Sequence, residues 1–552
     1  FLTLIGIIVW VVRQKQNDSA DYFLGGRDAT WLAIGASIFA SNIGSEHLIG
    51  LAGAGASSGM AMAHWEIQGW MILILGWVFV PFYTRSMVYT MPEFLERRYN
   101  PQSRTILSVI SLVSYVLTKV AVTVYAGGLV FQQVFGIKEL WGIDFFWIAA
   151  IGLVVLTALY TIFGGMKSVL YTSVLQTPIL LLGSLIILVL GFKELGGWDE
   201  MMRVCGAVTV NDYGDTMTNL IRSNDDANFP WLGALIGSAI IGFWYWCTDQ
   251  FIVQRVLSGK NEMEARRGTI FGAYLKLLPV FLFLIPGMIA FALHQKYIGA
   301  GGEGFLPLLA NGTANADAAF PTLVAKLLPA GVKGLVVCGI LAALMSSLAS
   351  LFNSSAMLFT IDFYKRFKPE TPEKKLVGIG QIATVVIVIL GILWIPIMRS
   401  VGDVLYTYLQ DVQSVLAPGI AAAFLLGICW KRTSAKGGMW GLISGMIIGL
   451  TRLGAKVYYS NAAVTDSSMF KYLFYDLNWL FFCGWMFLFC IVVVIVVSLM
   501  TEAPSAEKIQ GLVFGTSTPE QKAATRASWN HWDIIHTVII LAITAAFYWY
   551  FW

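Results

Sequence analysis

The stretch ASNIGSEHLIG, residues 40–50, places two serines, an asparagine, a glutamate and a histidine inside a segment that is otherwise as apolar as a membrane span. A charged side chain at the centre of such a span costs about 2.5–3.5 kcal/mol on insertion scales, and it persists only where it has a partner or a function. Gly44 lies amid these polar residues, where a helix can open and present backbone carbonyls. The stretch therefore predicts an interrupted membrane helix, with a glycine-rich packing surface as the alternative.

The rest of the chain has the composition of an integral membrane protein. It has 552 residues, of which 57% are apolar and 12% charged, and the apolar residues form long blocks. An α-helix needs about 20 mostly apolar residues to cross roughly 30 Å of hydrocarbon, and several blocks reach that length. The composition therefore predicts an all-α polytopic protein that is embedded in a lipid bilayer.

The apolar blocks predict fourteen membrane spans. They lie near residues 1–12, 30–52, 61–83, 105–135, 143–163, 168–192, 231–254, 269–295, 332–362, 377–398, 403–429, 437–457, 477–500 and 534–551. The first block, FLTLIGIIVWVV, runs straight into RQKQ without a small-residue cleavage site. This pattern favours a transmembrane helix over a signal peptide.

The loops between the predicted spans differ in charge. Alternate loops are rich in lysine and arginine, and these loops cover residues 13–27, 85–104, 255–267, 365–375 and 431–436. Because basic loops stay in the cytoplasm, we expect both termini to lie outside, and we expect the plasma membrane, or the inner membrane if the protein is bacterial. The net charge of +4 follows from this topology, and we expect no nucleic-acid partner.

Several function classes lack their motifs in this sequence. There is no Walker lysine motif and no HExxH motif, so neither an ATP-driven pump nor a zinc protease is expected. The six cysteines are scattered without a CxxC pair, so the sequence predicts neither a metal centre of that kind nor a disulfide framework. We expect the protein not to be an enzyme, and secondary transporter, channel and sensor remain as the leading classes.

Two charged side chains lie in distant spans, Glu66 within AMAHWEIQGW and Lys276 within GAYLKLLP. They are able to neutralise each other structurally, and they are equally able to supply an acceptor and a donor to a polyhydroxylated ligand. Single serines and asparagines inside spans are explained as well by hydrogen bonds between helices. The charged pair is therefore the stronger indication of a ligand site.

A second cluster indicates an ion site. Ala343, Ser346 and Ser347 stand at i, i+3 and i+4, so they share one face of a helix. Sodium binds hard oxygen ligands, and this face offers the hydroxyls of Ser346 and Ser347 and the carbonyl of Ala343. The carbonyls of Ala40 and Ile43, in the interrupted helix, are able to complete the coordination shell. The spacing therefore predicts a sodium site at these five positions.

Seven segments together resemble the sodium/glucose cotransporters of the solute:sodium symporter family. They are ASNIGSEHLIGLAG, YTMPEFLERRY, ALYTIFGGMKSVLYT, WYWCTDQFIVQRVLS, YLKLLP, LAALMSSLASLFNSSAMLFTIDFY and AAAFLLGICWKR. The resemblance runs through nearly the whole chain, and its most specific motifs are WYWCTDQ followed by VQR and the MSSL…FNSS segment. It implies a leucine-transporter-like core of two inverted five-helix repeats, with the first helix and the last three helices outside the core.

The resemblance also implies a division of the chain. The first transmembrane helix, which is truncated, and a cytoplasmic loop occupy 1–29, and the first repeat occupies 30–195. An extracellular or periplasmic loop follows at 196–230, and the second repeat, with an outer loop at 298–331, occupies 231–432. The remaining residues, 433–552, hold three C-terminal transmembrane helices.

The functional positions of the family are carried over residue by residue. The sodium site falls on the positions that the spacing had predicted, which are Ala40, Ile43, Ala343, Ser346 and Ser347. The positions that contact the sugar fall on Asn42, His47, Glu66, Lys276 and Gln410, with Tyr245 beneath the sugar as inner gate and Trp246 beside it. The apolar outer gate falls on Leu51, Trp65 and Tyr406. These residue types suit a hexose, because its hydroxyls donate and accept and its C–H face stacks on an aromatic ring.

The implied function is sodium-coupled symport of a monosaccharide of the glucose or galactose type by alternating access. Ser173 stands where relatives with a second sodium site have aspartate, which favours one sodium ion per sugar. Gly242 leaves out a side-chain contact that some relatives make with the sugar. Two alternatives remain, a symporter of myo-inositol or another polyol, and a sugar sensor or sodium-leak protein of the same fold that does not transport.

Overall fold

The computed structural model describes residues 18–44, 46–309, 312–398, 405–461 and 467–552, together with residues 6, 10 and 11. These parts are almost entirely helical, and their named strands are the short antiparallel pair β1 (Glu139–Leu140) and β2 (Ile143–Asp144). Within the described ranges, ten helical segments are long and apolar enough to cross a membrane. The helical, multi-pass class is therefore confirmed. The predicted first span lies outside the described residues apart from three positions, and the total of fourteen stays a prediction.

The helices of the first half come from the segments predicted as spans and from the loops between them. They are α2 (Ser19–Leu24), α3 (Trp31–Asn42), α4 (Ala52–Ser58), α5 (Ala63–Glu66), α6 (Gly69–Ile74), α7 (Val80–Ser86), α8 (Met91–Arg98), α9 (Pro101–Ser114), α10 (Ala121–Phe135), α11 (Phe145–Leu195) and α12 (Trp198–Gly206). Short π-helical turns, among them η2 (Glu46–Leu51), interrupt several of them. Such turns occur frequently at functional sites.

The second half continues in the same way. Its helices are α13 (Trp231–Gly242), α14 (Gln250–Leu257), α15 (Glu262–Lys276), α16 (Ile285–Gly299), α17 (Ala319–Leu327), α18 (Ala330–Met357), α19 (Lys365–Phe367), α20 (Glu373–Met398), α21 (Leu405–Cys429), α22 (Ala435–Asn461), α23 (Met469–Lys471), α24 (Trp479–Met500), α25 (Ala506–Ile509), α26 (Pro519–Ala527) and α27 (His531–Tyr550). The π-helical turns η6 (Phe243–Thr248) and η9 (Leu358–Tyr364) follow α13 and α18.

The predicted interruption near Gly44 is present. Helix α3 ends at Asn42, and Ile43, with φ −80° and ψ 96°, has left the helical region. The chain becomes helical again at η2. A second interruption, which the sequence did not predict, separates η6 from α14 at Asp249, with φ −76° and ψ 128°. Both breaks leave backbone polar groups without partners inside their own helix, so these groups are available to other ligands.

Helix α11 combines two of the predicted spans. Its backbone is non-helical at Gly165, where φ is 53° and ψ is −151°, and the gap between the predicted spans fell at this position. A Cβ atom on residue 165 would lie 2.5 Å from the carbonyl oxygen of Tyr22. The glycine is therefore required by both its backbone conformation and the close approach of α2.

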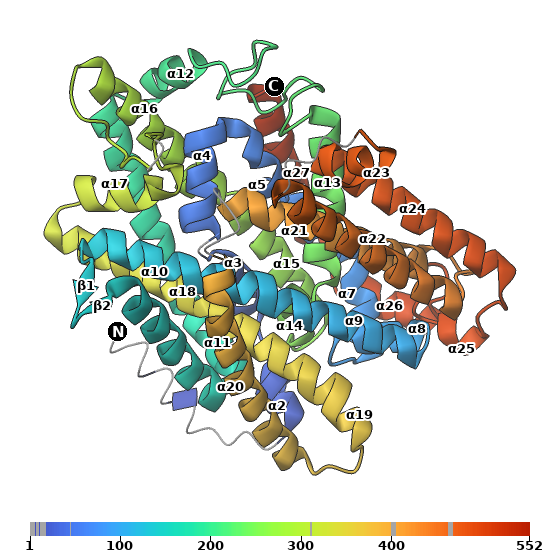
Figure 1. The fold of residues 1–552 in the computed structure, drawn as a ribbon. Coiled ribbons are helices and arrows are strands. Elements are labelled where there is room, and N and C mark those ends of the chain that lie inside the picture. Colours follow the sequence, from blue (N-terminus) through green and yellow to red (C-terminus); the bar gives the residue numbers. More distant parts are fainter. Residues whose placement is uncertain are drawn as a thin grey trace.

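Helix α3 lies near the middle of the bundle (Figure 1). It packs against α15, α11 and α18, and α11 in turn lies along α18. This packing places the break at the end of α3 next to the helix that carries the predicted sodium-site serines. Segments about 300 residues apart in the sequence are thus brought together, as the hydrogen bond between Ser41 and Ser350 shows.

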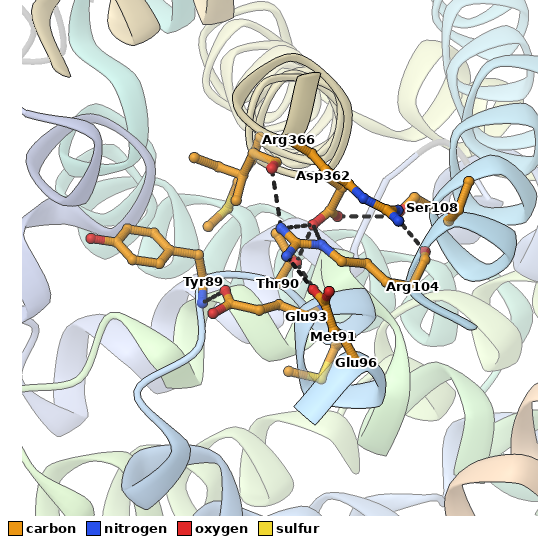
Figure 2. Close-up of polar contacts among 12 residues, drawn as sticks. Tyr89, Thr90, Met91, Glu93, Glu96, Arg104, Ser108, Asp362 and Arg366 are labelled. Carbon is orange, nitrogen blue, oxygen red and sulfur yellow. Dashed lines mark hydrogen bonds and ion pairs between the residues drawn. The ribbon is translucent and has the colours of Figure 1, made fainter. Parts of the chain in front are cut away.

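A polar cluster fixes one end of α18. Figure 2 shows Asp362, which lies in η9, surrounded by side chains from the segment before α8 and from α9. Its carboxylate accepts hydrogen bonds from Thr90 Oγ1 at 2.8 Å, Arg104 Nε at 2.7 Å and Ser108 Oγ at 3.1 Å. Arg104 also donates to Glu96 at 2.6 Å. Because the buried carboxylate has a cation and two hydroxyls as partners, its burial is compensated, and α8, α9 and α18 are held together.

Candidate functional site

A cavity lies beside both helix breaks. Its lining residues are Asn42, Glu46, His47, Trp65, Glu66, Gln68, Ile241, Gly242, Tyr245, Trp246, Lys276, Leu409, Gln410 and Gln413. All seven residues predicted to contact a sugar are among them, together with Trp65 of the predicted outer gate. The fold therefore brings into one cavity residues that the sequence had placed in five separate spans.

The charged residues of the cavity form one network. Lys276 Nζ lies 2.6 Å from Glu66 Oε2 and 3.3 Å from the amide oxygen of Asn42. His47 Nε2 lies 3.3 Å from the same glutamate oxygen, and Asn42 donates to the hydroxyl of Tyr245 at 3.0 Å. Asn42, His47, Glu66 and Lys276 are all buried. Glu66 and Lys276 thus form an ion pair that lines the cavity, and their contact with a ligand stays a prediction.

Two further polar atoms of the cavity have no hydrogen-bond partner among the described residues. They are the amide oxygen of Gln410 and the indole nitrogen of Trp65. Both residues are buried, with 7% and 3% of their surface exposed. A buried polar atom without a partner is costly, so each of these two atoms needs a hydrogen-bond partner beyond the described residues, such as a water or a solute. One acceptor and one donor suit the hydroxyl groups of a polar solute.

The side chain of Gln68 fills the space beside Gly242. A Cβ atom on this residue would lie 2.4 Å from the amide oxygen of Gln68, so the amide occupies that space. The Gln68 amide nitrogen donates to the carbonyl of Ser238 at 2.8 Å, which holds it in place. Sequence reasoning missed Gln68 because α5 ends at Glu66 and the backbone beyond it is irregular, so helical spacing gave no signal. It also missed Glu46, Ile241, Leu409 and Gln413 as lining residues.

The outer-gate residues have different surroundings. The ring of Trp65 stacks on Trp479 with centroids 5.5 Å apart and meets the edge of Phe229 at 6.1 Å. Leu51 is fully buried but does not line the cavity. The side chain of Tyr406 lies outside the described residues. Trp479 and Phe229 were not predicted here, because one lies beyond the predicted core and the other in a loop.

The five predicted sodium positions are buried, and Ser347 lies at the break that follows α3. Each is at most 1% exposed, and the set is Ala40, Ile43, Ala343, Ser346 and Ser347. Ser347 Oγ donates to the carbonyl of Ser41 at 2.9 Å, and Ser346 Oγ lies 3.3 Å from Ser173 Oγ. The oxygens available are carbonyls and hydroxyls, which are hard ligands suited to an alkali cation.

Interrupted membrane helices beside a buried polar cavity are typical of secondary transporters. The sequence profile of the sodium:solute symporter family matches residues 22–445, and the chain belongs to this family. The human sodium/myo-inositol cotransporter 2 is 36% identical over 530 residues, which cover 94% of this chain and 78% of that protein. The mouse sodium/glucose cotransporter 4 is also 36% identical over 530 residues, covering 94% of this chain and 76% of that protein.

A solved structure of a Na⁺-coupled sialic acid symporter has the same fold. Its TM-score is 0.71 with 22% sequence identity, and the superposition covers 91% of this chain and 98% of that chain. The family of the chain and the two cotransporter relatives show that the protein is a sodium-coupled solute symporter of the multi-pass membrane class and not an enzyme. Sodium as the coupling ion and the family resemblance are confirmed.

Proposed function

We propose that this symporter moves a neutral polyhydroxylated ring, a monosaccharide of the glucose type, together with one sodium ion. The observation that carries this proposal is the pair of buried atoms without partners, Gln410 Oε1 and Trp65 Nε1, in the same cavity as Glu66 and Lys276. A ring whose every hydroxyl donates and accepts can satisfy such a set of groups on several sides at once.

In this proposal, hydrogen bonds to the hydroxyls of the substrate replace hydrogen bonds that the residues of the network now make with one another. Lys276 and Asn42 turn their donors to the ring, and Glu66 accepts from it. Since one set of hydrogen bonds replaces another, the net gain comes from the groups that have no partner beforehand. Tyr245, which lines the cavity, supplies the aromatic surface beneath the ring.

Sodium and substrate are coupled through the break in α3. Carbonyls of Ala40 and Ile43 face the proposed ion, while Asn42, between them in sequence, lines the substrate cavity. Ordering of the break by sodium therefore positions Asn42 for the substrate, and the free energy of this coupling is reciprocal. Movement of one sodium ion down the membrane potential also releases about 2.3 kcal/mol of free energy for each 100 mV.

Alternating access follows from two inverted five-helix repeats, which we propose for residues 30–195 and 231–432. Closure over Trp65 by Trp479 and Phe229 seals one side of the cavity, and movement of Tyr245 opens the other. We place the basic loops in the cytoplasm and both termini outside, in the plasma membrane or its bacterial counterpart.

A single sodium ion fits the surroundings of Ser173. Its hydroxyl donates to the carbonyl of Val169 at 2.6 Å, and its neighbour across the helix pair is Ser346 Oγ rather than a carboxylate. A second sodium ion at this position would therefore lack the charge that an aspartate provides.

Myo-inositol is the second candidate substrate, because a relative with 36% identity is a sodium/myo-inositol cotransporter. Uptake of labelled glucose into proteoliposomes under a sodium gradient, in competition with glucose, galactose and myo-inositol, separates the two. We expect unlabelled glucose to compete at lower concentration than myo-inositol. The reverse order would select the second candidate, and a failure of all three to compete would contradict a polyhydroxylated ring as substrate.

Replacement of Gly44 by alanine tests the ion site. The new Cβ atom would lie 2.7 Å from Ser347 Oγ and 2.7 Å from Glu46 Oε2, so both oxygens must move away. We expect Gly44→Ala to raise the sodium concentration for half-maximal uptake about tenfold or more, the equivalent of about 1.4 kcal/mol. Gly152→Ala is the matched control, since nothing lies within 4 Å of its Cβ position. An equal sodium dependence in both variants would contradict the assignment.

A further inference from the structure

A buried lysine contacts the proposed inner gate from outside the substrate cavity. Lys119 belongs to the π-helical turn η5 (Tyr115–Val120), which joins α9 to α10, and its side chain is buried. Its Nζ lies 4.6 Å from the ring centroid of Tyr245. Among the described residues that line the cavity, Tyr245 is present and Lys119 is not. The ammonium group therefore reaches the tyrosine ring from outside the cavity.

Three more aromatic rings surround the same ammonium group. The ring centroids of Phe251, Tyr115 and Trp244 lie 4.6, 5.0 and 5.5 Å from Lys119 Nζ. A cation over the face of an aromatic ring is attracted by the quadrupole of the ring, and the attraction is stronger where water is excluded. These rings belong to η5, η6 and α14, so the ammonium group connects the turn that carries Tyr245 to two neighbouring segments.

Asp249 fixes the position of this ammonium group. Its Oδ2 lies 2.5 Å from Lys119 Nζ. Its Oδ1 accepts hydrogen bonds from the hydroxyl of Tyr115 and, at 3.2 Å, from the backbone nitrogen of Phe251. Asp249 is also the residue at which the backbone leaves the helical region between η6 and α14. The ion pair therefore ties η5 to the second helix break, which follows Tyr245 closely in the sequence.

We propose that Lys119 is a positioning residue of the inner gate, which holds the ring of Tyr245 in its closed place. The inference rests on the proposed function and deepens it, because it names a contact that keeps the gate shut. The hydroxyl of Tyr245 also accepts a hydrogen bond from Asn42 at 3.0 Å. A substrate that takes this donor of Asn42 removes one of the two contacts. In the empty protein both contacts hold the gate, and loss of Lys119 lets sodium pass without substrate.

The test measures uptake of radiolabelled sodium into proteoliposomes that contain the full chain, with and without sugar. Lys119→Met keeps the length of the side chain and removes its charge. We expect its sodium uptake without sugar to rise about fivefold or more, whereas Lys119→Arg, which keeps a cation among the rings, should stay within about twofold of the unmodified protein. Lys326→Met is the matched control and should cause no change, because Lys326 Nζ lies 4.8 Å from the ring centroid of Phe305 and neither residue lines the cavity.

A neutral double variant separates the gate from an ion pair that only stabilises the fold. Lys119→Met alone leaves the carboxylate of Asp249 buried without its cation, which is costly. Lys119→Met combined with Asp249→Asn leaves neither charge unpaired, so this protein serves the test if the single variant does not fold. We expect its sodium uptake without sugar to be raised about fivefold or more as well. Uptake as low as that of the unmodified protein would show a purely structural pair and overturn the inference.

Sodium uptake by the unmodified protein separates the inference from the proposed function. If sugar stimulates this uptake while Lys119→Met takes up no more sodium without sugar than Lys326→Met does, the role of Lys119 is wrong and the proposed function stands. If neither glucose, galactose nor myo-inositol stimulates sodium uptake by the unmodified protein, the proposed function is wrong. The uptake of the Lys119 variants without sugar then still decides whether this residue holds the gate.

Discussion

Glu66→Ala is expected to reduce sodium-driven sugar uptake at least about a hundredfold, because the change leaves the ammonium group of Lys276 buried without its carboxylate. Removal of one partner of a buried ion pair costs about 3–5 kcal/mol, and the proposed substrate would lose an acceptor as well. Sodium binding should change much less, since Glu66 is not among the proposed ion ligands. Uptake of labelled sugar and sodium-dependent thermal stabilisation, measured on the same preparation, check both parts.

Glu200→Ala is the control for the loss of an ion pair as such. Glu200 pairs with Arg203 at 2.7 Å on the surface, where 71% of the arginine side chain is exposed. Exposed pairs contribute about 0–1 kcal/mol, so this variant should transport normally. Uptake by Glu66→Ala at the level of Glu200→Ala would show that the Glu66–Lys276 pair is purely structural.

Ser347→Ala is the second change with a large expected effect. It removes a hydroxyl that donates to the Ser41 carbonyl at 2.9 Å and that we propose as a sodium ligand. We expect the sodium concentration for half-maximal uptake to rise about tenfold or more, since a small coordination shell loses one of its few oxygens. Sugar affinity at saturating sodium should change less.

Ser355→Ala is the matched control for this variant. Ser355 lies on the same helix, is fully buried, and its hydroxyl has no hydrogen-bond partner among the described residues. Both changes remove one buried hydroxyl from α18, but only one of them removes an oxygen from the proposed site. A sodium dependence that shifts equally in the two variants, or in neither, would refute the assignment of Ser347.

The features that the sequence predicted correctly have strong local causes. The break at Ile43 and Gly44 was predictable because polar residues and glycine are rare together in a span. The ion pair of Glu66 and Lys276 was one of two alternatives that the sequence left open, and it forms because an unpaired buried charge is costly. The location of the cavity could not be predicted from local sequence patterns alone, because Gln410 was assigned to the site only through the family resemblance.

What the sequence did not predict depends on packing between distant segments. Gln68 reaches the cavity because the chain is irregular beyond α5 and because Gly242 leaves room for its amide. Trp479 covers Trp65 although it belongs to α24, outside the predicted core. Glu46 looked like an unexplained charge, because its approach to Ser347 exists only when α18 lies against the break in α3.

Uptake of labelled glucose into proteoliposomes, with and without an inward sodium gradient, tests the central claim most directly. Coupled symport predicts that the gradient drives glucose inside transiently above its external concentration, and that a sodium ionophore abolishes this accumulation. Equal uptake with and without the gradient would contradict the account. So would a sugar-induced sodium current without movement of labelled sugar, which is the behaviour of a sensor.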